Sequence, residues 1–274
     1  MARESGKFNT TKTLPYEGTD TEFLGYIDTH SSSKIVAMFK DSNELKELKE
    51  GDEAILILDK SPFYAESGGQ IGDSGYIKTK DAKFYVQDTI KIKKNVFGHI
   101  GVLESGSLKC NEQVEALIDE HRRNDIKRNH SVTHLLHKAL KIVLGDHVEQ
   151  KGSLVDNLKT RFDFSHTKPI SNDEIQQIES IVNNEILTNK VTTTEMMSID
   201  KAKESGALML FGEKYDSEVR VLNIGNSIEL CGGTHVSNTG DIGLFKIYSE
   251  TGVASGVRRI EGVTGLNLIK FLND

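Results

Sequence analysis

The feature that most constrains this chain is a pair of short segments, each carrying two side chains of the kind that bind metal ions. Residues 130–134 read His-Ser-Val-Thr-His, and residues 231–235, about a hundred positions later, read Cys-Gly-Gly-Thr-His. In a helix, side chains four residues apart lie on one face, one turn apart. A tight Gly-Gly turn can aim the other two at the same point. Three imidazoles and one thiolate form a tetrahedral set that zinc prefers. The spacing therefore predicts a zinc site with these ligands: His130, His134, Cys231 and His235.

Length and composition describe an ordinary globular protein. The 274 residues are 36% hydrophobic and 27% charged, which suits a chain with two subdomains. No apolar run approaches the length of a membrane helix, so no membrane partner is expected. Two cysteines give no disulfide framework, and a reducing cytoplasm is the expected location. The net charge of −7 opposes a free-standing nucleic-acid binder, unless basic residues cluster locally or a neighbouring domain does most of the binding.

The sequence pattern predicts an α+β fold. Up to about residue 115, short β-rich runs alternate with Gly, Asp and Ser at hairpin spacing, which is typical of a small β-barrel or sandwich. Residues 114–144 show a long helical pattern, and helices mixed with mostly antiparallel strands follow. We expect a β-barrel subdomain over residues 1–113, which carries a glycine-rich loop. We expect an α/β two-layer domain over residues 114–274, which carries the metal ligands.

The first histidine pair differs from the zinc-protease helix. In that helix a glutamate follows the first histidine and acts as the general base. Here the position is Ser131. Peptide hydrolysis by that mechanism is therefore disfavoured.

The glycine-rich loop lies within residues 61–73 (SPFYAESGGQIGD). Its two adjacent glycines allow close backbone approach to a ligand, and exposed amides there can hold an anion or a carbonyl. Glu66 and Gln70 bracket the turn with one acid/base group and one amide able to orient water. The alternative is a glycine-rich β-turn with polar tips, which these residues alone leave open.

A second glycine-punctuated stretch, residues 252–259, ends in two arginines. The guanidinium fork suits phosphate recognition, so Arg258 and Arg259 are candidate substrate-binding residues. A hairpin with outward-pointing charges is the alternative.

Four segments resemble the editing domain of alanyl-tRNA synthetase. They are FYAESGGQIGDSG, NHSVTHLLHKALKIVLGDHVEQKGSLV, RFDFSH and CGGTHVSNTGDIGLFKIYSETGVASGVRRIEGVTG, in the family's order between residues 61 and 265. The resemblance implies a deacylase that hydrolyses Ser-tRNA(Ala) and Gly-tRNA(Ala), with the zinc ligands named above. It also implies substrate binding by the loop residues Ser67, Gly68 and Gly69, with Gln70 at the position associated with editing. Free-standing relatives often carry threonine where this chain has Glu66.

The resemblance also bears on extent and partners. Nothing in the chain resembles the ATP-binding motifs of an aminoacylation core, so we expect a piece of a synthetase that edits but does not charge tRNA. The expected partners are the acceptor end of tRNA(Ala) and the remainder of the parent synthetase. That remainder would supply most of the tRNA binding and would account for the acidic balance of this piece.

Several mechanisms are compatible with these residues. Serine and glycine straddle alanine in size, so polar recognition is needed to spare alanine. The serine hydroxyl could be read by zinc, by the hydroxyl of Thr133, or by the Gln70 loop, with Gln70 and Glu66 as candidates for orienting the attacking water. Two other readings stay open: a zinc-stabilised tRNA-binding module without catalysis, and a metal-dependent hydrolase of small esters or amides.

Overall fold

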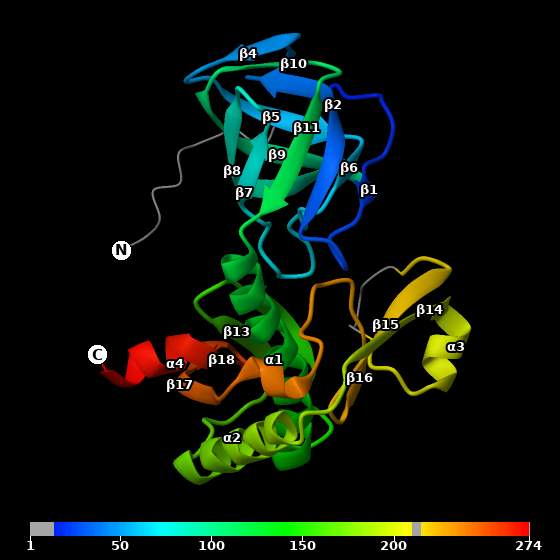
Figure 1. The fold of residues 1–274 in the computed structure, drawn as a ribbon. Coiled ribbons are helices and arrows are strands. Elements are labelled where there is room, and N and C mark those ends of the chain that lie inside the picture. The colour runs from blue at the N-terminus through cyan, green and yellow to red at the C-terminus, as the bar shows by residue number, and fades with distance from the viewer. Residues whose placement is uncertain (1–13, 210–214, 274) are drawn as a thin grey trace. The chain divides into compact units, whose positions relative to one another are not determined.

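The computed structural model describes residues 14–209 and 215–273 (Figure 1). By its internal contacts the chain divides into two compact units. Among the described residues, the first unit comprises those up to 66 together with 72–120, and the second comprises 67–71 together with those from 121 onward. The glycine-rich loop thus belongs with the second unit, whereas the sequence grouped it with the first, and the boundary falls at residue 120 instead of 113.

The first unit is a closed antiparallel barrel of six strands. Its ring runs β11-β7-β8-β9-β5-β2, and a second pairing of β11 with β2 closes it. The strands of this unit are β1 (Glu22–Phe23), β2 (His30–Lys40), β3 (Asn43–Glu44), β4 (Glu47–Lys49), β5 (Glu53–Leu58), β6 (Lys60–Ser61), β7 (Gly75–Lys78), β8 (Lys83–Lys93), β9 (Val96–Ser105), β10 (Ser107–Lys109) and β11 (Gln113–Ile118). The predicted barrel is confirmed, and closure leaves its ring strands without free edges.

The predicted start of the long helix is wrong. Residues 113–118 form the strand β11, in which Val114, Ala116 and Ile118 are buried while the residues between them are more exposed. Helix α1 (Glu120–Leu144) begins only after this strand. The apolar positions of the strand were absorbed into the helical pattern because a period of two and a period of 3.6 cannot be told apart over so few residues.

The second unit combines two antiparallel sheets with helices. Its elements are α1, β12 (Gln150–Val155), β13 (Thr160–Ser165), α2 (Asn172–Leu187), β14 (Thr193–Ser198), α3 (Ile199–Glu204), β15 (Glu218–Ile224), β16 (Ser227–Leu230), the 3₁₀ turn η1 (Thr239–Ile242), β17 (Phe245–Ala254), β18 (Val257–Thr264) and α4 (Gly265–Asn273). One sheet has the order β12-β13-β18-β17, and the other has the order β14-β15-β16. This confirms the expected two-layer α/β architecture with mostly antiparallel strands.

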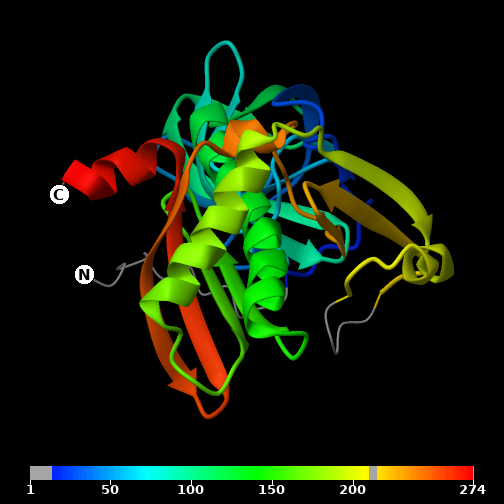
Figure 2. The ribbon, with the colours of Figure 1, turned by 90° about the horizontal axis from the view of Figure 1, so that it is seen from below.

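The main core of the second unit lies between two helices and one face of the four-stranded sheet. Helices α1 and α2 lie side by side across that face (Figure 2). Leu136 and Leu140 of α1 and Val182 of α2 belong to the same buried cluster as Phe162 and Ile260 of the sheet. This packing fixes the rotation of α1, and therefore the direction in which its histidines point.

The local sequence signals of the second unit agree with its structure. Ser171 caps α2, and Glu174 returns the bond to the cap backbone, which together form a capping box. Gly145 follows α1 with a φ of 114°, a conformation that favours glycine. None of the helices in residues 14–209 and 215–273 is long and apolar enough to cross a membrane.

Candidate metal centre

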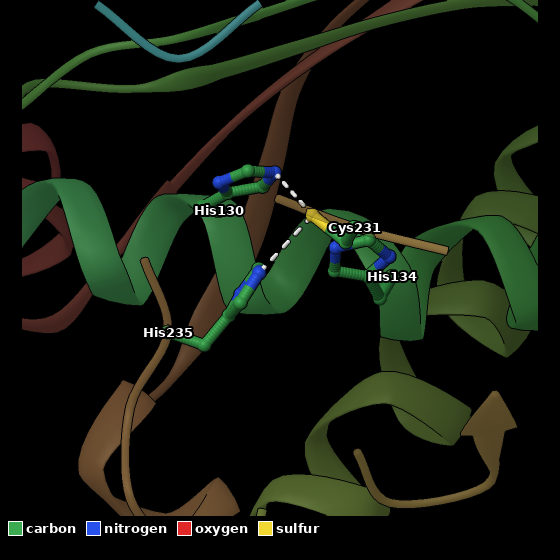
Figure 3. A group of neighbouring side chains, drawn as sticks. All are labelled: His130, His134, Cys231 and His235. Atoms are coloured by element: carbon green, nitrogen blue, oxygen red, sulfur yellow. Dashed lines mark hydrogen bonds between the residues drawn. The ribbon is translucent and has the colours of Figure 1, made fainter. Parts of the chain in front are cut away.

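Four side chains of the second unit converge on one point. The ligand-type atoms of His130, His134, Cys231 and His235 all lie within 4.8 Å of one another. The Cys231 sulfur is 3.5 Å from Nε2 of His130 and 3.2 Å from Nε2 of His235 (Figure 3). Both histidines of the first pair are buried, whereas Cys231 and His235 are half-buried. The structure thus brings together the two segments that the sequence predicted would meet.

The secondary structure explains the convergence. His130 and His134 lie one turn apart on α1, and their rings stack with centroids 5.4 Å apart. Strand β16 runs directly into the turn that carries Cys231. A methyl group on Gly233 would overlap the imidazole of His130, so only glycine allows the turn to pass this close to the helix.

In each of the three imidazoles, the Nδ1 atom lies near a polar group other than the Cys231 sulfur. Nδ1 of His130 is 2.7 Å from Oε1 of Gln70, and Nδ1 of His134 is 2.6 Å from Oε2 of Glu229. Nδ1 of His235 is 3.4 Å from the hydroxyl of Ser131. Since a carboxylate and an amide oxygen only accept, the first two rings donate from Nδ1, which leaves Nε2 as the atom that can bind a metal once it carries no proton.

The charges of the cluster depend on one another. Burial alone would raise the pKa of the Cys231 thiol, but the neighbouring imidazoles outweigh it and hold that pKa well below its usual range. Burial also lowers the pKa of His235 to about 3, against the pull of the thiolate. Burial would lower the pKa of His134 as well, yet Glu229 and the thiolate raise it to about 10. The neighbouring imidazoles therefore favour the thiolate of Cys231, the form that binds metals.

The donor set fits a divalent metal ion. Zinc–nitrogen bonds near 2.0–2.1 Å and a zinc–sulfur bond near 2.3 Å place tetrahedral ligand atoms about 3.5 Å apart. The two measured sulfur–nitrogen distances match this, and the 4.8 Å limit needs only a modest contraction. Nε2 of His134 is buried and has no hydrogen-bond partner among the described residues. A bare buried nitrogen is costly, and a metal ligand position would satisfy it.

The glycine-rich loop lies along the edge of β12. The amide of Val155 donates to Gly69, and the amide of Ile71 donates back to Val155. Gly69 has a φ of 85°, and a side chain there would lie 2.5 Å from the carbonyl oxygen of Ser153. Gly68, with a φ of 59°, faces open space. The loop is thereby held in place, with Gln70 pointing inward and Gly68 exposed.

Gln70 is buried and its amide is engaged on both sides. Its oxygen accepts from Nδ1 of His130 and from the Thr234 backbone amide, at 2.7 and 2.9 Å. Its nitrogen donates to the Thr234 hydroxyl at 2.9 Å. Gln70 therefore joins the two segments of the candidate metal centre, through His130 on one side and Thr234 on the other.

The other predicted polar residues have different surroundings. Thr133 is buried on α1, and its hydroxyl donates to the carbonyl of Asn129 at 2.8 Å and lies 2.7 Å from the Thr160 hydroxyl. Ser67 is half-buried within the loop. Glu66 is exposed, at the edge of the first unit, and its backbone amide donates to Thr89.

Both candidate arginines are held by carboxylates of the same sheet. Arg258 donates two bonds to Glu250, at 2.5 and 2.6 Å. Arg259 donates two bonds to Asp163, at 2.7 and 2.8 Å. These forked ion pairs neutralise much of the positive charge of the two arginines, which the sequence had suggested for phosphate binding.

Sequence reasoning missed the residues that hold the ligands. Glu229 is two positions before Cys231 on an extended segment, so both point to the same side, and this is the signal that could have identified it. Arg220 was also missed; its guanidinium donates to the carbonyl oxygens of Cys231 and Gly233 at 2.9 and 3.0 Å. Arg220 lies on β15, and no pattern in the sequence connects it with the turn.

Comparison with known proteins places the chain in a family. Residues 219–261 match the family model described as the threonyl and alanyl tRNA synthetase second additional domain, and residues 2–122 match the model for class II (A) tRNA synthetases. The chain is 56% identical over 271 residues to an alanine–tRNA ligase of Delftia acidovorans, covering 99% of this chain and 31% of the relative. Alanine–tRNA ligases of Polynucleobacter asymbioticus and Aromatoleum aromaticum are 56% and 55% identical, covering 99% and 100% of this chain.

The fold and the matched models define a region of a class II aminoacyl-tRNA synthetase that includes its second additional domain. The chain belongs to the alanyl-tRNA synthetase family. It spans about a third of the length of the relatives it matches.

Proposed function

We propose that this chain is an editing deacylase that hydrolyses Ser-tRNA(Ala) and Gly-tRNA(Ala), with zinc held by His130, His134, Cys231 and His235. The observation that carries the proposal is the convergence of three imidazoles and one thiolate in a chain of the alanyl-tRNA synthetase family. Zinc is favoured over harder ions such as magnesium because the donors are nitrogen and sulfur. The proposed setting is the cytoplasm, as part of a synthetase that carries out aminoacylation elsewhere in its length.

The proposed reaction is ester hydrolysis at the 3′ end of the tRNA. Water adds its oxygen to the ester carbonyl carbon, and the bond from that carbon to the ribose oxygen breaks. A proton from the water passes to this ribose oxygen, which leaves as a hydroxyl, and the amino acid leaves with a free carboxyl group. A bound zinc ion supplies Lewis-acid polarisation or a more acidic water. The exposed Gly68 and the half-buried Ser67 are proposed to bind the aminoacyl end, where the open side of the glycine leaves room for a ligand.

For Gln70 we propose a positioning role instead of water orientation. Its amide already bonds His130 and Thr234, so its first effect is to hold a ligand ring and the Cys231 turn together. Glu66 remains the proposed water-orienting group. The Thr133 hydroxyl is proposed as a reader of the substrate hydroxyl, and it would have to exchange its bond to Thr160 to do so.

Arg258 and Arg259 are proposed to meet the phosphates of the acceptor end. Because each is already paired with a carboxylate, each would contribute little net attraction, and the rest of the synthetase would supply most of the tRNA affinity. This agrees with the overall net charge of −7.

One observation favours a second candidate, a zinc-stabilised tRNA-binding module without turnover. Four protein ligands make a closed set of the structural type, whereas catalytic zinc usually keeps one position for water. The two functions differ in turnover.

Incubating the protein with Ser-tRNA(Ala), Gly-tRNA(Ala) and Ala-tRNA(Ala) and measuring ester loss tests the proposal. We expect rapid loss from the first two, little from the third, and no loss above the spontaneous rate after chelation. Restored zinc should restore the rate. Binding of all three tRNAs without ester loss would support the non-catalytic module and contradict the deacylase.

A further inference from the structure

We propose that the three imidazoles of the metal set are held to different degrees, with Glu229 fixing His134 as the anchor and His235 the ligand most able to leave. This rests on the metal site of the proposed function and deepens it, because one exchangeable ligand would let a closed set admit substrate. The difference lies in the partner of each Nδ1 atom: a carboxylate, an amide, and a distant hydroxyl.

Glu229 is buried and receives three hydrogen bonds. Its Oε2 accepts from Nδ1 of His134 at 2.6 Å. Its Oε1 is 3.2 Å from Nδ1 of His137 and accepts from the Ser227 hydroxyl at 2.9 Å. The carboxylate therefore cannot rotate without breaking bonds on both oxygens, and it holds the ring of His134 in one orientation.

A carboxylate behind an imidazole does more than orient it. It makes the opposite nitrogen a stronger donor to a metal, and loss of such a partner commonly weakens metal binding about 10–100-fold. In His134 that opposite nitrogen is the buried Nε2, which has no hydrogen-bond partner among the described residues. The carboxylate also brings a negative charge to a set in which zinc and one thiolate leave one positive charge.

His137 shares the carboxylate without belonging to the metal set. It lies on α1 beyond His134, packs against Phe162 at 5.3 Å between ring centroids, and is buried. Its bond to Glu229 keeps the second carboxylate oxygen occupied. His137 thereby supports the positioning of His134 indirectly.

His130 has an intermediate position. The amide oxygen of Gln70 fixes its tautomer at 2.7 Å but brings no charge. His130 also lies on the buried face of α1, so its backbone is held by the helix. We therefore expect it to be oriented well, with less electronic support than His134.

His235 is held least. Its Nδ1 is 3.4 Å from the Ser131 hydroxyl, beyond the usual range of a hydrogen bond. That same hydroxyl accepts the Val236 amide at 3.1 Å. His235 also lies outside helix and strand and is half-buried. Its ring can therefore turn away at lower cost than either histidine of α1.

Metal affinity tests the proposed role of Glu229 in holding His134. The Glu229→Gln variant keeps the shape of the side chain and removes its charge. Glu179→Gln is the matched control, because Glu179 is a mostly buried carboxylate whose partners are Lys246 and the Ile247 amide. Competition with a chromogenic chelator should show zinc and cobalt affinities about 10–100-fold weaker for Glu229→Gln, and within twofold of wild type for Glu179→Gln.

The cobalt absorption spectrum separates positioning from structural support. A positioning role predicts shifted visible bands in Glu229→Gln, with circular dichroism and thermal midpoint of the metal-free protein close to wild type. An unchanged affinity and spectrum would overturn the role of Glu229. If Glu229→Gln does not fold, Glu229→Asp replaces it, which keeps the charge but retracts it from His134, and the same outcomes decide.

Substitution of the proposed ligands tests the order in which the histidines are held. We expect His235→Ala to retain one equivalent of cobalt with affinity reduced about tenfold, and His134→Ala to lose more than a hundredfold. The reverse order would overturn the ranking, and a wild-type protein that binds no divalent metal would overturn the whole inference. These measurements use no tRNA, so a metal-binding protein without deacylation would contradict the proposed function alone.

Discussion

Two regions of this molecule bury histidines in opposite ways. In the barrel, His99 is fully buried and both ring nitrogens have partners: the Ser61 hydroxyl at 2.7 Å and the Leu56 carbonyl at 2.9 Å. In the second unit, His134 is also buried, but its Nδ1 meets a carboxylate and its Nε2 meets no hydrogen-bond partner among the described residues. Burial lowers the pKa of His99 to about 4, whereas Glu229 and the thiolate overcome burial and raise that of His134 to about 10.

The comparison shows what distinguishes a structural histidine from a candidate metal ligand. Burial is common to both and decides nothing. The decisive feature is whether the ring lies among other metal-binding atoms. The ligand-type atom of His134 lies within 4.8 Å of those of His130, Cys231 and His235, whereas His137, whose Nε2 also has no hydrogen-bond partner among the described residues, lies outside that group. Four changes would break or sharpen this contrast.

The largest effect is expected from the loss of Cys231. Cys231→Ala removes the only sulfur donor of the set, so deacylation of Ser-tRNA(Ala) and metal affinity should each fall about a thousandfold or more, or ~4 kcal/mol. Cys110→Ala is the matched control, because Cys110 is half-buried and its thiol donates to the Val36 carbonyl, away from the candidate metal group. Metal analysis and an ester-loss assay on both variants test this. Equal metal content in the two variants would contradict the ligand set.

The next effect concerns pH and the barrel histidine. With its pKa lowered from 6.5 to about 4, His99 stays neutral in the folded state where the unfolded state takes up a proton. The contribution of His99 to the free energy of unfolding is therefore fully present above about pH 6.5. It is lost as the pH falls towards 4, which lowers the free energy of unfolding by roughly 3 kcal/mol.

The His99→Gln variant should lose this pH dependence. Urea unfolding of wild type and variant at pH 7 and pH 4.5 measures it, because the other titrating groups are common to both proteins and cancel. Parallel pH dependence in the two proteins would show that His99 does not titrate as its surroundings require.

A smaller effect is expected from the turn that approaches α1. Gly233→Ala places a methyl group against the imidazole of His130, which must move and leave its ligand position. We expect metal affinity at least about tenfold weaker, with the barrel unaffected. Gly252→Ala is the control, because its methyl group meets only the end of the Arg258 side chain, at 3.0 Å. Isothermal titration with zinc distinguishes them, and wild-type affinity in Gly233→Ala would refute the close approach.

The smallest effect is expected from Arg259→Gln. Its forked pair with Asp163 is partly exposed, with 29% of the arginine side chain accessible, so its loss should cost at most ~1 kcal/mol. Binding of uncharged tRNA should weaken less than about threefold, because the carboxylate already offsets the charge. A loss greater than tenfold, measured by filter binding at fixed salt, would show that the arginine leaves its carboxylate for phosphate.

The sequence predicts the architecture well where the signal is periodic or carried by adjacent residues. The β-rich runs identify the barrel, and the four-residue spacing of His130 and His134 places both on one face of a helix. The capping box at Ser171 is likewise formed by residues close together in the sequence. The start of α1 could not be placed, because β11 is short and its closure of the barrel depends on pairing with β2 and β7.

The surroundings of the site depend on contacts between distant residues. Gln70 reaches His130 across sixty positions because the loop pairs with β12, and a glycine-rich sequence does not reveal that pairing. Glu229 looked like an ordinary strand residue, although it holds two histidines of α1. The grouping of His130, His134, Cys231 and His235 was therefore predictable from the sequence, and the hydrogen bonds that support these side chains were not.

The most direct test of the account is X-ray absorption at the zinc edge on the zinc-loaded protein. The account predicts one sulfur near 2.3 Å and three imidazole nitrogens near 2.0–2.1 Å, with the sulfur signal absent in Cys231→Ala and unchanged in Cys110→Ala. A shell made only of oxygen and nitrogen in the wild-type protein would contradict it.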